Sequence, residues 1–166
     1  DPMNEPSDQE QLEALSREFL QAMEERRTGR IDEAEKRLRS IIRAEPRLAE
    51  PHLALGRLLL DTDRLEEAED YARLGLEHLE QSGVWTQDLP ANVVQGVAHS
   101  LLGEVLRRRA DSDAIIFGDP AVFQGLLAEA KLCFERAQAA DPEDSYSAHQ
   151  AFFLDAGGPS KGAETN

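Results

Sequence analysis

The sequence predicts an all-α protein built from a repeated pair of helices. Residues 29–35, Gly-Arg-Ile-Asp-Glu-Ala-Glu, recur at 63–69 as Asp-Arg-Leu-Glu-Glu-Ala-Glu, so that Ala34 and Ala68 stand 34 residues apart. A fixed period of this length is typical of stacked helical repeats. Around both copies the apolar residues return every three or four positions, which is the spacing of an amphipathic helix.

Composition limits the kind of partner that the chain can bind. With 166 residues, 40% of them apolar, the chain can bury the core of one domain. It carries 33 acidic and 18 basic side chains, a formal net charge of −15. This charge disfavours nucleic acids and anionic membrane surfaces and favours basic or mixed-charge protein partners. A homo-oligomer remains possible.

The single cysteine and the hydropathy pattern point to a compartment. Cys133 has no second cysteine with which to form an internal disulfide or a thiolate metal cluster. A reducing compartment, and hence a cytoplasmic location, is the simpler interpretation. No stretch approaches the roughly 20 apolar residues of a membrane-spanning helix, and the acidic start does not resemble a signal peptide.

The elements follow in order from a flexible segment at 1–9. The first repeat, 12–46, opens with the apolar stripe of Leu12, Leu15, Phe19 and Met23 and continues with Leu38, Ile41 and Ile42. The second repeat, 49–82, begins around Pro51, a residue tolerated in a first helical turn. The acidic run that follows is expected to be a solvated helix face and comprises Glu66, Glu67, Glu69 and Asp70.

The positions of small residues and prolines carry a family resemblance, which covers roughly 12–154. Two Leu-Gly pairs end at Gly56 and Gly103, and the remaining matches are Ala34, Ala68, Ala130, Pro46, Pro142, Phe134 and Ala137. The chain therefore resembles the tetratricopeptide-repeat family, in which small residues stand where paired helices cross. A larger side chain there would hold the helix axes apart. The resemblance implies a right-handed helical solenoid of about three helix pairs.

Several positions depart from the family pattern. His52 and His99 stand where the family often carries tryptophan, and Glu80 replaces a closing proline. Ile41 and Gly75 replace the usual alanine of the second helix. The stripe of the opening helix lies about one residue out of the family register.

A first insertion separates repeats two and three. Gly56 and Gly103 are 47 residues apart, 13 more than the period, and residues 83–95 carry the excess. The insertion contains Trp85, for which two interpretations stand. The indole can fill the gap between repeats, which is the more common role of such a residue, or it can serve as an exposed anchor for a partner.

A second insertion lies inside repeat three, 96–142. Gly103 and Ala130 are 27 residues apart, whereas Gly56 and Ala68 are 12 apart. Because apolar spacing continues on both sides, we expect both helices to run about two turns longer as a protruding hairpin. Its tip, 111–119, contains Ile115, Ile116 and Phe117, which can fold back on the stem or stay exposed. We hypothesise that these three residues contribute to partner binding or self-association.

The chain ends with one more predicted helix and a polar tail. Residues 145–156 place Tyr146, His149, Phe152 and Phe153 on one face, behind Ser145 as a cap. A solenoid needs such a final helix to cover its last repeat, so we expect a C-terminal capping helix that completes one domain over 10–156. The tail 157–166 is expected to be disordered.

No pattern of catalytic or metal-ligating residues is present. The histidines, His52, His78, His99 and His149, lack the spacing of a metal pair, and Cys133 lies on an apolar helix face. The sequence has no glycine-rich phosphate loop, nucleophile elbow or His-Glu-x-x-His motif. We therefore predict a protein without catalytic, cofactor-binding or metal-binding residues, and not an enzyme.

The resemblance also implies a concave groove lined by the first helix of each pair. Projected onto this chain, its positions are Arg27 in repeat one, Leu53, Arg57, Leu60 and Asp61 in repeat two, and Ser100, Glu104, Arg107 and Arg108 in repeat three, with Glu50 and Val97 beside them. Guanidinium groups suit the carboxylates or carbonyls of an extended peptide, and leucines supply apolar contact. The alternative is that Arg57 and Arg107 pair internally with acidic neighbours.

These observations favour an adaptor or scaffold that binds a partner peptide in the groove. A dedicated cytosolic chaperone is the first alternative, because the acidic three-repeat chaperones of bacterial secretion systems are similar in length and charge. A homo-oligomer joined through Trp85 or the hairpin tip is the second. The lysine and asparagine residues of the carboxylate clamp that binds chaperone tails are absent, because the corresponding positions include Arg57 and Glu104. Co-chaperone function is therefore disfavoured.

Overall fold

The computed structural model describes residues 7–85, 89–144, 147 and 154. Within these residues the chain forms seven helices and no strand, which confirms the predicted all-α helical repeat. The helices are α1 (Asp8–Arg27), α2 (Ile31–Ala44), α3 (Ala49–Asp61), α4 (Leu65–Glu80), α5 (Ala91–Ala110), α6 (Asp113–Ile116) and α7 (Pro120–Ala140).

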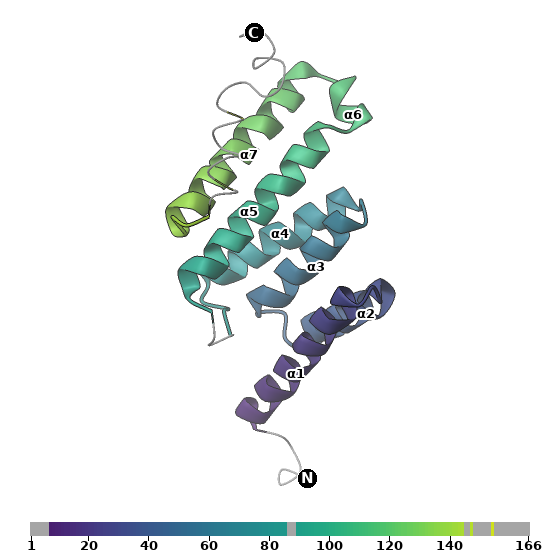
Figure 1. Cartoon of the computed structure of the whole chain (residues 1–166), viewed down its shortest axis with the longest axis vertical. Helices are drawn as coiled ribbons and strands as arrows, with labels where there is room; N and C mark the ends of the chain where they lie inside the picture. Colours follow the sequence, from purple (N-terminus) through teal and green to yellow (C-terminus); the bar gives the residue numbers. More distant parts are fainter. Residues whose placement is uncertain (1–6, 86–88, 145–146, 148–153, 155–166) are drawn as a thin grey trace.

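Three helix pairs stack along the long axis of the molecule. The pairs are α1 with α2, α3 with α4, and α5 with α7, the last two being joined through the short helix α6 (Figure 1). Contacts of α2 with α3 and of α4 with α5 join one pair to the next, and α3 also contacts α5. The first helices α1, α3 and α5 therefore form one side of the stack and the second helices α2, α4 and α7 the other.

Local signals set the ends of several helices. Ser7 caps α1 through a reciprocal capping box with Glu10, and Asp119 caps α7 ahead of Pro120 in its first turn. The turns inside the first two pairs each need a residue with positive φ, Gly29 (85°) and Asp63 (60°), which are 34 residues apart. Glycine adopts this conformation freely and aspartate tolerates it. The 34-residue repeat therefore includes the backbone conformation of the turn as well as the two helices.

Small residues stand where paired helices approach, as the pattern predicted. A Cβ on Gly56 of α3 would lie 3.4 Å from the backbone oxygen of Ala68 in α4. A Cβ on Gly103 of α5 would lie 2.9 Å from two ring atoms of Phe134, which is completely buried in α7. Position 75, where the family usually has alanine, has a steric reason to be glycine, because the side chain of Leu53 occupies the space of a Cβ there.

The core is a continuous apolar cluster that passes through all three pairs. Its fully buried members include Leu38, Leu55, Leu59, Leu106 and Phe134. The carboxylate of Glu25 in α1 is also buried, and it accepts a 2.6 Å hydrogen bond from Nε of Arg37 in α2. The guanidinium of Arg37 holds the pKa of Glu25 below its ordinary value and so keeps the carboxylate charged in this setting.

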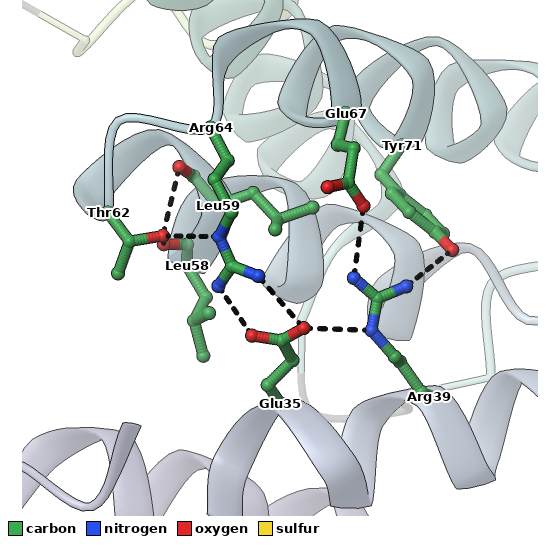
Figure 2. A network of polar contacts seen from close by, with 8 residues as sticks. All are labelled: Glu35, Arg39, Leu58, Leu59, Thr62, Arg64, Glu67 and Tyr71. Atoms are coloured by element: carbon green, nitrogen blue, oxygen red, sulfur yellow. Dashed lines mark hydrogen bonds and ion pairs between the residues drawn. The ribbon is translucent and has the colours of Figure 1, made fainter. Parts of the chain in front are cut away.

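The side formed by the second helices carries an ion-pair network that the sequence did not predict. Figure 2 shows Glu35 of α2 accepting hydrogen bonds from Arg39 on the same helix and from Arg64 at the start of α4. Arg39 in turn donates to Glu67, at 3.1 Å, and to the hydroxyl of Tyr71, also at 3.1 Å. The Arg64 guanidinium, helped by Arg39, lowers the pKa of Glu35.

This network corrects the expectation of a solvated acidic face on α4. Glu67 is bonded by Arg39, and Glu69 pairs with both Arg73 and Arg109. The acidic run therefore joins neighbouring helix pairs through charge-assisted hydrogen bonds, and only part of it faces water alone.

The inserted hairpin is present and ends in a short helix. Helices α5 and α7 have 20 and 21 residues, against 13 and 16 in α3 and α4, so both run longer as predicted. The single turn of α6 forms the tip. Ile116 is 50% exposed and Phe117 is 84% exposed, while Ile115 is half-buried. The tip is therefore an exposed apolar feature, and the fold-back alternative is wrong for Ile116 and Phe117.

The first insertion returns to the opening helix. The half-buried indole of Trp85 meets the ring of Phe19 in α1 edge to face, with centroids 5.7 Å apart. Trp85 thus packs inside the molecule, although against α1 rather than between repeats two and three.

The expected capping helix at 145–156 lies mostly outside the described residues. Its two described positions, Ser147 and Leu154, are both helical, and Leu154 packs against the core cluster. Of the segment 1–9 that was expected to be flexible, residues 1–6 lie outside the described part, but the expectation is wrong for 7–9, because Ser7 caps α1 and the helix begins at Asp8. The tail 157–166 lies wholly outside the described part.

Candidate protein-binding cavity

A cavity of about 500 Å³ opens on the side formed by the first helices. Its walls come from α1, α3 and α5, with Leu89 before α5 and two aspartates after α7. The residues that line it are Phe19, Met23, Arg26, Glu50, Leu53, Ala54, Arg57, Leu89, Val94, Gly96, Val97, Ser100, Leu101, Glu104, Asp141 and Asp144. Its volume lies within the roughly 300–1,000 Å³ of ligand pockets in proteins.

The interior of the cavity is apolar and partly open to water. Leu53, Val94 and Leu101 are buried beneath it and anchor it to the core cluster. Val97 of α5 is 55% exposed, and Leu89 is exposed beside it. Covering exposed apolar side chains in a concave surface with a ligand lowers the free energy of the system. This cavity therefore suits the apolar side chains of a ligand.

A chain of four charged residues links the first helices, and three of them, Arg26, Arg57 and Glu104, line the cavity. Arg26 of α1 pairs with Asp61 of α3 at 3.1 Å, and Asp61 pairs with Arg57 at 3.4 Å. Arg57 then pairs with Glu104 of α5. The two arginines are thereby neutralised by two carboxylates, and the chain ties together the three first helices.

The internal pairing of Arg57 settles one of the alternatives raised by the sequence. Its guanidinium contacts Asp61 and Glu104, so the interpretation in which Arg57 pairs within the protein is the one found. Four of the projected groove residues do line the cavity, together with the neighbouring Glu50 and Val97. They are Leu53, Arg57, Ser100 and Glu104.

The structure places the remaining projected residues elsewhere. Arg27 pairs with Glu24 on the exposed surface of α1, and its neighbour Arg26 lines the cavity instead. Leu60 is completely buried, because it belongs to the core cluster. Arg108 donates to the carbonyl of Leu60 at 3.3 Å. Neither Asp61 nor Arg107 is among the residues that line the cavity.

The hairpin residues lie away from this cavity. Ile115, Ile116 and Phe117 are at the far end of the α5 and α7 hairpin (Figure 1). They form a second exposed surface and contribute no side chain to the cavity lining.

Several lining residues were missed by the sequence, for identifiable reasons. Phe19 and Met23 belong to the apolar stripe of the opening helix, so the signal existed but the register was uncertain. Leu89 lies in an insertion with no repeat equivalent. Asp141 and Asp144 follow α7, where the next first helix of a repeat would begin, and repeat symmetry could have indicated them.

The three described histidines, His52, His78 and His99, and Cys133 are buried or half-buried, whereas His149 lies outside the described residues. His52 is buried, donates from Nδ1 to the carbonyl of Leu48 at 2.8 Å, and stacks on His78 with ring centroids 4.8 Å apart. Burial lowers the pKa of His52 and of His99, so both rings favour the neutral form. Burial raises the pKa of Cys133 to about 11, which keeps the thiol protonated.

The described residues hold neither a metal-ligand group nor a spanning helix. Across 7–85, 89–144, 147 and 154, no three His, Cys, Asp or Glu side chains are grouped so that they could bind a metal ion. Likewise, no helix formed by those residues combines the length and apolarity needed to cross a membrane.

Stacked helix pairs with small residues at their crossings define a helical-repeat protein that presents a first-helix cavity. The family model described as Tetratricopeptide repeat matches residues 26–85, from the end of α1 to Trp85. The match supports the assignment of this segment to the tetratricopeptide-repeat family. No curated protein matched the chain. Repeats of this family generally mediate interactions between proteins.

Proposed function

We propose that this protein is an adaptor or scaffold that binds a polypeptide segment of a partner protein in the cavity between α1, α3 and α5. The observation that supports this most directly is the exposed apolar lining at Val97 and Leu89, in a cavity large enough for several side chains. Covering this lining would stabilise a complex by the hydrophobic effect. We infer that the protein acts by binding and without catalysis.

The charges around the cavity indicate which charged side chains the partner segment carries. Arg26 and Arg57 are paired with carboxylates of the protein itself and so are poor receptors for an acidic ligand. Asp141 and Asp144 add two more carboxylates to the lining. An oxygen of Asp141 accepts a hydrogen bond from the backbone amide of Glu143, and one of Asp144 from that of Ser147. The partner segment is therefore proposed to combine apolar side chains with lysine or arginine.

A cytoplasmic location is part of the same proposal. The only cysteine of the sequence is buried and free, which suits a protein that works in a reducing compartment.

The cavity proposal predicts that Val97→Glu weakens partner binding at least tenfold, or about 1.4 kcal/mol. A carboxylate placed among apolar side chains must be desolvated when the partner covers it, and this cost opposes the complex. The partner is first captured from an extract of the source organism with the wild-type protein and identified by mass spectrometry. Its affinity is then measured by isothermal titration calorimetry.

Val122→Glu is the matched control. Val122 has a similar exposure, 47% against 55% for Val97, but stands on α7 near the hairpin tip and outside the cavity. The cavity proposal requires unchanged affinity for Val122→Glu. Normal binding by Val97→Glu would contradict it.

The hairpin tip is a second candidate surface, favoured by the exposure of Phe117. An aromatic side chain exposed at 84% next to an exposed isoleucine is a frequent anchor in protein interfaces. Self-association or partner binding through the tip would reverse the outcome of the same experiment, because Val122→Glu would then weaken binding and Val97→Glu would not.

A further inference from the structure

A residue outside the cavity between α1, α3 and α5 neutralises arginines inside it. Asp61 does not line the cavity, but its carboxylate pairs with Arg26 at 3.1 Å and with Arg57 at 3.4 Å, and both arginines line it. Arg57 also pairs with a second carboxylate, that of Glu104 in α5. In the part of the chain that the structure describes, Asp61 is the only acidic side chain paired with Arg26. The neutralisation of Arg26 there therefore depends on Asp61.

Asp61 stands at a position where the other two repeats carry arginine. It lies 34 residues after Arg27, and the two are the last residues of α3 and α1. Counted from the Leu-Gly pairs, Asp61 is five residues after Gly56, and Arg108 is five residues after Gly103. Repeat two thus has a carboxylate where its neighbours have a guanidinium.

An aspartate at this position is unfavourable for α3 itself. The last turn of a helix carries partial negative charge, which disfavours a carboxylate and favours a basic side chain. Helices α1, α2, α4 and α5 each have a basic residue in their last turn, while α3 has none. The ion pairs of Asp61 with Arg26 and Arg57 offset this cost. The arginines, and not the helix, therefore explain the carboxylate at position 61.

Without this carboxylate, Arg26 would offer the cavity an unpaired guanidinium. Its side chain is 32% exposed, so a ligand in the cavity can reach it. A guanidinium is weakly hydrated and can form two parallel hydrogen bonds with a carboxylate, so Arg26 would then attract acidic ligands. With Asp61 present, both lining arginines are paired, and the acidic lining residues Asp141 and Asp144 favour a basic ligand.

We propose that Asp61 sets the charge preference of the cavity, so that the cavity selects basic over acidic polypeptide segments. This inference rests on the proposed function, because it concerns the ligand of the same cavity. Asp61 acts through Arg26 and Arg57, and is therefore a positioning residue for the ligand.

Two small ligands with the same apolar body and opposite charge measure this preference. Phenylbutylamine is a cation and phenylbutyrate an anion at neutral pH, and each has one phenyl ring for the apolar lining. Both are titrated into the isotopically labelled protein, and the NMR methyl signals of Leu53 and Val97 report binding in the cavity. Leu132, exposed on α7 and outside the lining, supplies the reference signal. The measured quantity is the ratio of the two dissociation constants.

The wild type is expected to bind phenylbutylamine more tightly than phenylbutyrate. Asp61→Asn should shift the ratio toward phenylbutyrate roughly tenfold, since the carboxylate beside Arg26 is lost and the guanidinium becomes available. Combining Arg26→Gln with Asp61→Asn should restore the preference of the wild type, because the released guanidinium is then removed as well.

Two controls separate this role from a change in net charge or in stability. Glu24→Gln also removes a negative charge that is paired with an arginine of α1, but that arginine, Arg27, is not among the cavity-lining residues. Its ratio should stay within about twofold of the wild type. Asp61→Glu keeps a carboxylate and should keep the preference. If Asp61 only ties α1 to α3, Asp61→Asn would lower the melting temperature without changing the ratio.

The outcomes separate this inference from the cavity proposal itself. An unchanged ratio in Asp61→Asn, with both ligands still shifting the signals of Leu53 and Val97, would overturn the role of Asp61 and leave the cavity proposal standing. A wild type that prefers phenylbutyrate would do the same. If neither ligand shifts these signals in the wild type, the inference fails together with the cavity proposal on which it rests.

Discussion

Replacing Phe134 by alanine is expected to lower the free energy of unfolding by about 3–5 kcal/mol. The ring is completely buried in α7 and packs directly against the backbone of α5 at Gly103. Its removal leaves a cavity that neither helix can fill, because α5 and α7 are held by their contacts with each other and α5 is also held by α4. Chemical denaturation followed by circular dichroism measures the loss.

Phe117→Ala is the matched control for this substitution. Phe117 is the same residue type but is 84% exposed at the hairpin tip, so its loss should change stability by no more than about 0.5 kcal/mol. Equal effects of the two substitutions would mean that the pairing of α5 with α7 does not depend on the buried ring.

Gly103→Val is expected to destabilise the protein by about 2–3 kcal/mol, because the added side chain overpacks the contact between α5 and α7. The Cβ alone would lie 2.9 Å from two atoms of the Phe134 ring, and valine adds two methyl groups. Because the ring is enclosed on all sides, the clash must be relieved by moving α5 away from α7. Thermal and chemical denaturation should both report the loss.

Two further variants identify the cause as crowding at the crossing. Gly56→Ala should be nearly neutral, because its Cβ would lie 3.2 Å from a leucine methyl group that can shift and alanine favours the helix. Combining Gly103→Val with Phe134→Leu should cost less than the sum of the single effects, since the smaller side chain relieves the clash. Strict additivity would show that the two residues do not meet.

The fold of the first two repeats could be predicted because the pattern recurs in the sequence itself. The crossing residues Ala34 and Ala68 mark equivalent points, and the apolar spacing around them shows which face of each helix is buried. The long hairpin was also predictable, since the distance from Gly103 to Ala130 gave the added length. The extra turn of helix at its tip was not, because four residues carry no periodic signal.

The cavity was only partly predictable, because its position depends on helix register and on long-range pairing. A one-residue uncertainty in the opening helix was enough to select Arg27 in place of Arg26. Leu60 stands at a groove position by its spacing in the sequence, yet its side chain is buried in the core. The pairing of Arg57 with Glu104, 47 residues away, depends on how the pairs stack, which single-helix patterns do not contain.

The ion-pair network was missed for a related reason. A run of acidic residues on a helix usually faces water, so Glu67 and Glu69 gave no local sign of their partners. Their partners Arg39 and Arg109 lie 28 and 40 residues away in the sequence. Comparing equivalent positions of successive repeats could have suggested the network.

Binding of a partner protein in the cavity between α1, α3 and α5 is tested most directly by site-specific photo-crosslinking. A benzophenone amino acid is placed at Val97 in one protein and at Phe117 in another, and both are irradiated in the cells of the source organism. We predict that the side chain at position 97 crosslinks to a partner protein and the one at position 117 does not. Crosslinks from position 117 alone would contradict the claim.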